Sequence, residues 1–303
     1  MEFEIKNIRE GIFLLTYLGE YDAAHHFALS EDAELKNIKK KINEAFSDIE
    51  EGRGKNRIHK KYINNLKETL VDEADIQWVK KSHQASVFLW MWLACVSEQC
   101  QKSNKKFHPG ITRELTSILQ EIEFGLFSRT EWPIKTPHTD KQYYLSSLYA
   151  LDLSSGSYSE KRHLVNAISD EYKKSTPEIE RDFSWLSNAT ESQLYWVLNQ
   201  FMKERSMNSF LHYLDQTNED NLHILPYIYY FWGKDDAEKK LWLIRLKKNY
   251  ANMKHREKVK DKAPVNIRIS PAAKKKLIRL EKKFNRNRSE VIEHLIEQAW
   301  AEK

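Results

Sequence analysis

A short run near the C-terminus alternates polar and apolar residues, and its polar members could hydrogen-bond to a nucleic acid. Residues 264–270 read Pro-Val-Asn-Ile-Arg-Ile-Ser. In a β-strand, Asn266, Arg268 and Ser270 would share one face, because strand side chains alternate with period 2. A two-stranded ribbon with such a face fits the major groove of DNA. The run therefore predicts a strand whose polar face is available to DNA.

The other face of this strand is apolar and indicates that a second chain is needed to cover it. Val265, Ile267 and Ile269 would lie on that face and pack downward. A single strand has no partner for its backbone N–H and C=O groups, and two short helices cannot close a core around it. We therefore expect a homodimer, in which one strand from each subunit joins an antiparallel intermolecular ribbon.

The first of two expected helices runs from about Pro271 to Phe284 and follows the strand directly. Ser270 suits the N-cap, and proline suits the next position, where it lacks only an N–H that would be unbonded anyway. Apolar residues recur at spacings of three and four, which predicts one buried stripe along the helix. The stripe consists of Ala273, Leu277, Leu280 and Phe284.

The second expected helix opens after a break at Asn285 and Arg286. Asn287 and Glu290 have the spacing of a capping box, in which each residue bonds the backbone N–H of the other. The apolar stripe of this helix is Ile292, Leu295, Ile296 and Ala299. The expected dimer core combines the strand and both helices, and its members are Ile267, Ile269, Leu277, Leu280, Ile292, Leu295 and Ile296.

Residues 264–300 resemble the methionine repressor and Arc repressor superfamily of ribbon-helix-helix DNA-binding proteins. The resemblance lies in Asn-Ile-Arg-Ile-Ser-Pro at 266–271 and in Asn-Arg-Asn-Arg-Ser-Glu-Val-Ile at 285–292. The family often has glycine at the position of Asn285. Asparagine is also tolerant of a left-handed backbone conformation, so this departure from the family is small.

The resemblance implies DNA-contacting roles for residues of the strand and of the second helix. Asn266 and Arg268 correspond to the residues that read base edges, while Pro264 and Ser270 lie on the same face of the strand. The N-terminus of the second helix corresponds to a phosphate anchor, which free N–H groups and the helix dipole would favour. The residues at this anchor are Asn287, Arg288 and Ser289.

The order of elements that precedes the strand is similar to that of the macrodomain Ter protein, a bacterial chromosome organiser. A helical bundle is expected at 188–257, a linker at 258–263 and the ribbon-helix-helix unit at 264–303. The similarity covers residues 188–300. It implies a bundle that flanks the DNA, a palindromic site and a dimer.

The net charge of +5 hides a strongly basic C-terminal end. Residues 234–303 contain 21 lysine and arginine residues against 10 acidic ones, and residues 239–283 contain 17 against 3. Such density predicts phosphate binding and an affinity that falls steeply with salt. The expected phosphate contacts in and after the last bundle helix are Arg245, Lys247, Lys248, Lys254, Arg256, Lys258, Lys260 and Lys262.

The rest of the chain predicts a mainly α fold with a large N-terminal helical domain at 1–185. Only 8 glycines and 7 prolines are present in 303 residues, too few for the turns of a strand-rich protein. The apolar run at 87–96 is too short to span a bilayer and is expected to be a buried helix. In the long helix expected at 235–257, the side that carries Leu241, Ile244 and Lys248 is expected to face the bundle.

Patterns typical of enzymes, metal sites and exported proteins are missing from the sequence. It has neither a glycine-rich phosphate loop nor a nucleophile elbow, and no pair of cysteines or histidines has metal-ligand spacing. His25 and His26 are adjacent in an aromatic helical context, and His83, His108, His138 and His163 are scattered. Cys95 and Cys100 are five positions apart on one expected helix, which suits neither a disulfide nor a shared metal. We therefore expect no enzymatic activity and no cofactor. We also expect a cytoplasmic, nucleoid-associated location, since no targeting segment is visible.

These features favour a homodimeric, sequence-specific DNA-binding protein that regulates transcription in a bacterium, phage or plasmid. Residues 1–185 exceed what a ribbon protein needs and could dimerise, contact polymerase or bind another protein, and no residue pattern decides among these roles. One alternative is an architectural protein that organises a chromosome or plasmid. A second is an antitoxin-like module whose N-terminal domain binds protein. A third is a small helical appendage with a solvated basic face.

Overall fold

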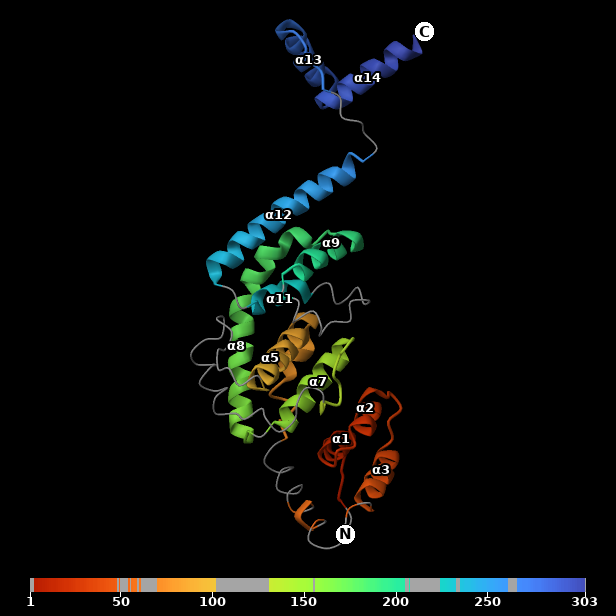
Figure 1. The fold of residues 1–303 in the computed structure, drawn as a ribbon, viewed down its shortest axis with the longest axis vertical. Helices are drawn as coiled ribbons and strands as arrows, with labels where there is room; N and C mark the ends of the chain where they lie inside the picture. The colour runs from red at the N-terminus through yellow and green to blue at the C-terminus, as the bar shows by residue number, and fades with distance from the viewer. Residues whose placement is uncertain are drawn as a thin grey trace. The chain divides into compact units, whose positions relative to one another are not determined.

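The computed structural model is helical in every regular element that it describes (Figure 1). It describes residues 3–47, 70–101, 131–154, 156–204, 224–232, 235–260 and 266–302, together with the isolated positions 49, 54, 56–58, 60 and 207. It divides into two compact units, residues 1–249 and residues 250–303, here called unit 1 and unit 2. The division falls within one long helix, whereas the sequence pattern predicts boundaries near 186 and 258–263.

Unit 1 begins with three helices: α1 (Ile8–Tyr17), α2 (Tyr21–Leu29) and α3 (Leu35–Ser47). Their common core includes Ile12 and Ile38, which are fully buried. Gly11 allows α1 and α3 to approach closely, because a Cβ at this position would lie 2.5 Å from Cγ2 of Ile38. Gly19 forms the turn into α2 with a φ of +83°, a conformation that glycine adopts without strain.

The centre of unit 1 is built from α5 (His83–Gln101), α7 (Asp140–Leu153) and α8 (Tyr158–Phe183). The expected burial of the apolar run on α5 is confirmed, since every side chain from 87 to 94 is buried. A short 3₁₀ helix, η1 (Gln77–Lys81), precedes α5. Trp90 on α5 donates its indole N–H to Oγ of Ser146 on α7 at 3.0 Å, so the contact between these helices includes a satisfied polar pair.

Helix α8 is longer than its sequence suggests. The pattern predicts a helix at 159–174 and a new start at Thr176-Pro177, but the structure has one helix with Pro177 inside it. An internal proline costs about 3 kcal/mol of helix stability. Ile179 and Phe183, which follow the proline, are buried, and Phe183 packs against Tyr229 with ring centroids 5.3 Å apart. Burial of these side chains offsets the cost of the proline.

The last part of unit 1 comprises η4 (Ser184–Leu186), α9 (Glu191–Met202), α11 (Leu225–Phe231) and the first half of α12 (Asp236–Lys258). Aromatic rings connect these elements to the centre of the unit. Phe231 lies 5.6 Å from Phe88 of α5, and Trp242 of α12 lies 5.0 Å from Phe201 of α9 between ring centroids. Residues 188–249 therefore share a compact unit with the helices before them.

The face of α12 that was expected to pack on the bundle is exposed. Leu243 and Leu246 are buried, whereas Leu241 is 49% exposed and Ile244 is 63% exposed. The expectation that Leu241, Ile244 and Lys248 face the bundle is therefore wrong. Residues 241–246 read Leu-Trp-Leu-Ile-Arg-Leu, which is apolar around most of the helix. Such a pattern does not distinguish one side from another.

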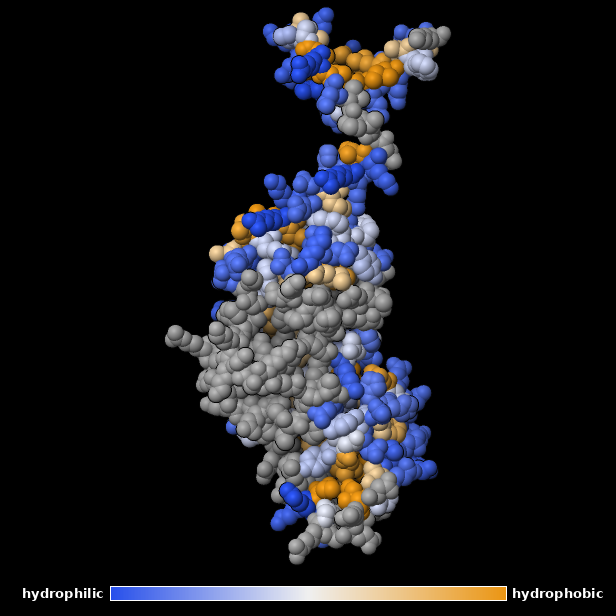
Figure 2. Space-filling model, in the orientation of Figure 1, coloured by the Kyte–Doolittle hydropathy of each residue, from blue (hydrophilic) through white to orange (hydrophobic). Residues whose placement is uncertain are grey.

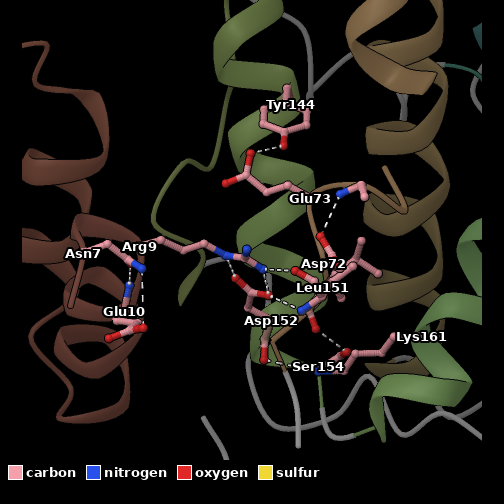
Figure 3. A network of polar contacts seen from close by, with 12 residues as sticks. Asn7, Arg9, Glu10, Asp72, Glu73, Tyr144, Leu151, Asp152, Ser154 and Lys161 are labelled. Atoms are coloured by element: carbon pink, nitrogen blue, oxygen red, sulfur yellow. Dashed lines mark hydrogen bonds and ion pairs between the residues drawn. The ribbon is translucent and has the colours of Figure 1, made fainter. Parts of the chain in front are cut away.

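A buried ionic network joins parts of unit 1 that lie far apart in the sequence (Figure 3). The guanidinium of Arg9 on α1 donates to both carboxylate oxygens of Asp152 on α7, at 2.7 and 2.6 Å. It also donates to the carbonyl of Val71 at 2.6 Å, and the Val71 N–H donates to Asp152 Oδ1 at 3.1 Å. Lys161 on α8 donates to the backbone carbonyl of Asp152 at 3.3 Å. The network therefore links α1, α7, α8 and the segment before η1.

Unit 2 contains the helix pair that the sequence predicts. Helix α13 (Pro271–Phe284) begins after Ser270, whose hydroxyl accepts from the N–H of Ala273 at 3.2 Å. Asn285 has φ 51° and ψ 43°, so the expected left-handed residue is confirmed. Helix α14 (Arg288–Ala301) begins with the expected capping box of Asn287 and Glu290. Both helices and their caps are thus as expected.

The described part of the β-strand expected before α13 has no strand structure. Residues 266–270 have no regular secondary structure, and the described residues contain no β-strand at all. The fold class with one β-strand per chain, paired across a dimer, is therefore wrong for this structure. A β-strand requires a neighbouring strand for its backbone groups, and no other extended segment of the described chain pairs with this one. The segment lies exposed at the N-terminal side of α13.

Candidate nucleic-acid interface

The helix pair of unit 2 has little core of its own. Leu277 and Val291 are the buried apolar side chains of α13 and α14. Several members of the expected dimer core are exposed, including Ile267 at 52% and Ile296 at 62%. Figure 2 shows apolar side chains gathered over the junction of the two helices. The exposed large apolar side chains of unit 2 are Ile267, Ile269, Ile278, Leu295, Ile296 and Trp300, and this set is here called the apolar face of unit 2.

The apolar face differs in part from the expected dimer core. Leu280 and Ile292 are half-buried, and Leu277 is buried within one chain. The expected dimer core did not include Ile278 or Trp300, both of which are exposed, and Trp300 is 76% exposed. The spacing of four between Ile296 and Trp300 places both on one side of α14 and could have indicated the second residue.

The expected base-reading residues lie on the exposed segment at 266–270, which has no regular secondary structure. Asn266 and Arg268 are both exposed there. Ser270, which was expected on the same DNA face, uses its hydroxyl to cap α13. Pro264 and Lys262 lie outside the described residues. Of the four expected strand residues, Asn266 and Arg268 therefore have exposed polar groups that take no part in the helix cap.

The expected phosphate anchor at the start of α14 is partly occupied by the protein's own groups. Oδ1 of Asn287 accepts from the Glu290 N–H at 3.1 Å, and Glu290 Oε2 accepts from the Asn287 N–H at 3.0 Å. Arg288 donates from Nε to Oε1 of Glu281 on α13 at 2.8 Å. The N–H groups of Arg288 and Ser289 belong to the first turn, where an α-helix offers no internal acceptor. A phosphate would bind these groups beside the Glu290 carboxylate.

Basic side chains expected to contact phosphate are distributed over both units. Arg245, Lys247 and Lys248 belong to unit 1, where Lys247 is half-buried and the other two are exposed. In unit 2, the exposed members of the set are Lys254, Arg256, Lys258 and Lys260. Further exposed cations surround α13, and these are Lys274, Lys275, Lys276, Arg279, Lys282 and Lys283. Unit 2 thus combines a basic surface with its apolar face.

The buried network of unit 1 is a less suitable functional site. Lys161 is fully buried, and burial lowers its pKa from 10.5 to about 8. Perturbed lysines of this kind serve as nucleophiles or bases in some enzymes. Here, however, Asp152 is also fully buried, and both of its carboxylate oxygens accept hydrogen bonds from Arg9. A substrate would not reach these groups, so we assign the network a role in holding α1, α7 and α8 together.

Two other classes of site were sought in the part of the chain that the structure describes. It holds no group of three or more histidine, cysteine and acidic residues placed to bind a metal ion. None of its helices combines the length and apolar character needed to cross a membrane.

Comparisons with family models, curated proteins and solved structures found no match for this chain. The resemblance of residues 264–300 to the ribbon-helix-helix superfamily therefore rests on their sequence pattern.

Proposed function

We propose that the protein binds double-stranded DNA as a homodimer through unit 2 and regulates transcription at specific sites, in association with the nucleoid. The observation that carries this proposal is the apolar face of unit 2 beside its exposed cations. The helix pair has two buried apolar side chains, Leu277 and Val291, which is too small a core for independent stability. Something must cover the apolar face, and a second copy presents the same face in a self-complementary way.

In this proposal, bases are read by the exposed segment at 266–270. Asn266 and Arg268 carry the amide and guanidinium groups that form paired hydrogen bonds with adenine and guanine in the major groove. Both are exposed and lie outside any helix, so their side chains can reach a base edge. A dimer would present two such segments related by two-fold symmetry. The corresponding DNA site would be an inverted repeat.

Phosphate contacts supply most of the affinity in this proposal. The exposed cations of unit 2, on α13 and in the part of α12 after residue 249, are suited to the DNA backbone, and each neutralised phosphate releases counterions. The acidic residues of unit 2 lie mainly on α14 and at its C-cap, where Glu290, Glu293, Glu297 and Glu302 are exposed. The side of unit 2 that carries α13 is therefore the better candidate for the DNA-facing side.

The proposal can be tested by fluorescence anisotropy with a labelled duplex and the full chain. The logarithm of the binding constant should fall linearly with the logarithm of the salt concentration, with a slope of about −0.9 for each phosphate contacted. A chain that shows no binding at about 50 mM salt would overturn the proposal, because electrostatic attraction is strong under that condition.

A further inference from the structure

Helix α12 carries apolar side chains on two opposite sides. Leu243 and Leu246 are buried. Leu241 and Ile244, each two positions earlier, are 49% and 63% exposed. Because residues two positions apart differ by about 200° around an α-helix, this second pair points away from the core of unit 1. A helix that is apolar on opposite sides is normally covered on both.

The exposed apolar pair belongs to a regular row. Leu241 and Ile244 are the most exposed large apolar side chains among the described residues of unit 1. Ala237 and Lys248, which are also exposed, extend the row with spacings of four, three and four. A second α-helix packs along a row of this spacing in a coiled coil. The row of these four residues is here called the outer stripe of α12.

Cations lie beside the apolar pair of the outer stripe. Lys240 and Lys248 each lie four positions from Ile244. Arg245 lies four positions from Leu241, and helix residues at this spacing are neighbours on the surface. All three cations are exposed, and no carboxylate of the described residues forms an ion pair with them. The outer stripe is therefore apolar at its centre with positive charge around it.

This combination suits an acidic polypeptide better than DNA. Lysine and arginine bind phosphates, but a phosphate backbone offers no apolar surface to cover Leu241 and Ile244. An acidic polypeptide offers both carboxylates and apolar side chains. The cations that we propose to contact DNA lie in unit 2, so those of the outer stripe are available to another partner.

A second copy of α12 suits the outer stripe less well, because it would bring the same cations together. Each copy has three cations beside its apolar pair and one exposed carboxylate nearby, that of Glu238, three positions before Leu241. Like charges would therefore outnumber opposite charges between two copies, and like-charged neighbours destabilise a helix interface. A partner with carboxylates beside its apolar residues would pair with all three cations.

We propose that the outer stripe of α12 binds an acidic amphipathic helix of a partner protein. Apolar residues of the partner, at alternating spacings of three and four, would cover Leu241 and Ile244. Aspartate and glutamate residues on either side of them would pair with Lys240, Arg245 and Lys248. The interaction is separate from DNA binding through unit 2, so either one can fail without the other.

Fluorescence anisotropy of the full chain with three labelled synthetic helices, at about 150 mM salt, tests this site. The acidic helix has three repeats of Glu-Ile-Ala-Ala-Leu-Glu-Glu. The basic helix has lysine in place of every glutamate, and the alanine helix has alanine in place of every isoleucine and leucine. We expect the acidic helix to bind with a dissociation constant of about 100 µM or lower and the other two to bind at least about tenfold more weakly. No binding of the acidic helix, or equal binding of either other helix, would overturn the proposal.

A neutral substitution locates the binding on α12. Ile244→Ser should weaken the acidic helix about tenfold, because an apolar contact is lost while every charge is kept. Ile244 is exposed, so the chain should remain folded. The control is Leu29→Ser, which removes an exposed apolar side chain from α2. Equal losses in the two variants would contradict the assignment to the outer stripe.

A second substitution tests the charge of the site. Arg245→Gln should weaken the acidic helix about threefold and reduce the dependence of its binding on salt, because one exposed ion pair is lost. Lys36→Gln, at an exposed position of α3, should leave both unchanged. An Arg245→Gln variant that kept the full salt dependence would overturn the pairing of Arg245 with the partner.

Two further readouts examine the other occupants. If Ile244→Ser weakened a DNA duplex as much as the acidic helix, DNA would cover the outer stripe. If the same variant reduced self-association of the full chain in sedimentation velocity, and Leu29→Ser did not, a second copy would cover it. Either result would overturn the proposal, and we expect both readouts to match the wild-type chain.

Discussion

Arg288 and Glu281 form an ion pair between the two helices of unit 2, with Nε of Arg288 at 2.8 Å from Oε1 of Glu281. The pair joins the first turn of α14 to the last turns of α13. The ion pair holds the Arg288 guanidinium next to the proposed phosphate anchor, but the Glu281 carboxylate already neutralises part of the guanidinium charge. To bind a phosphate there, Arg288 must break its bond to Glu281 or bind both groups at once.

Removing this competition should strengthen phosphate binding. Glu281→Ala is expected to raise the affinity for any duplex and to make the salt slope steeper by about one per subunit, because Arg288 can neutralise a further phosphate. Both residues are partly exposed, so the helix pair should lose less than about 1 kcal/mol. Anisotropy titrations over a series of salt concentrations measure the slope. Glu297→Ala is the control, since it removes the same charge from α14 away from Arg288, and an equal change in its slope would refute the role of Arg288.

The apolar face of unit 2 should be required for dimerisation. Ile296→Asp places a charge where the proposed second copy packs, and Ile296 is exposed within one chain, so the subunit itself should remain folded. We expect the wild-type chain to sediment as a dimer and this variant as a monomer. Gln298→Asp, at another exposed position of α14, should remain dimeric. A wild-type chain that is monomeric at all concentrations would rule out the homodimer.

The two kinds of DNA contact should respond differently to mutation. Arg268→Ala is expected to cost about 1–3 kcal/mol of affinity for the specific site and to leave binding to unrelated DNA nearly unchanged. Lys258→Ala should weaken all duplexes about equally, because a phosphate contact carries no sequence information. Competition titrations with specific and unrelated duplexes measure both effects. Uniform weakening by Arg268→Ala would show that this residue contacts the backbone.

The network of unit 1 predicts a pH-dependent stability centred on Lys161. Burial lowers its pKa from 10.5 to about 8, against the opposing effect of Asp152, while Arg9 lowers it further. Between these two pH values the unfolded chain binds more protons than the folded chain, so stability rises with pH. The penalty is fully present below pH 8 and is lost as the pH approaches 10.5.

Comparison with Lys161→Met isolates this effect, because the titrating tyrosines are common to both proteins. The stability of the wild-type chain relative to the variant should increase by about 3 kcal/mol between neutral pH and about pH 10. Denaturant unfolding at the two pH values provides the measurement. Lys173→Met, at an exposed position, should show no such change. If the stability difference between the wild-type chain and Lys161→Met stayed constant with pH, the Lys161 ammonium would not be buried in the folded chain.

Local features of unit 2 could be predicted from the sequence. The N-cap at Ser270, the left-handed Asn285 and the capping box at Asn287 depend on residues within four positions of one another. Such interactions form within a single chain and are readable from residue type and spacing. The helices of unit 2 were therefore correctly placed.

Features that depend on distant residues could not be predicted in the same way. A strand at 264–270 would require a partner outside the segment, and the alternation of its residues gives no information on whether that partner is present. The exposed face of α12 was misassigned because Leu241 and Leu243 are equally apolar, and only the packing of α9 and α11 selects the buried side. The pairing of Arg9 with Asp152 joins residues 143 positions apart, which no local spacing indicates.

The most direct test of the central claim is selection of DNA fragments that the full chain binds at about 150 mM salt, a condition that suppresses purely electrostatic binding. We expect enrichment of a short inverted repeat, with enrichment lost in Arg268→Ala. Few sites near promoters would agree with a regulator, whereas many scattered sites would indicate a chromosome-organising protein. Absence of any enriched sequence, with binding only at low salt, would contradict site-specific recognition by unit 2.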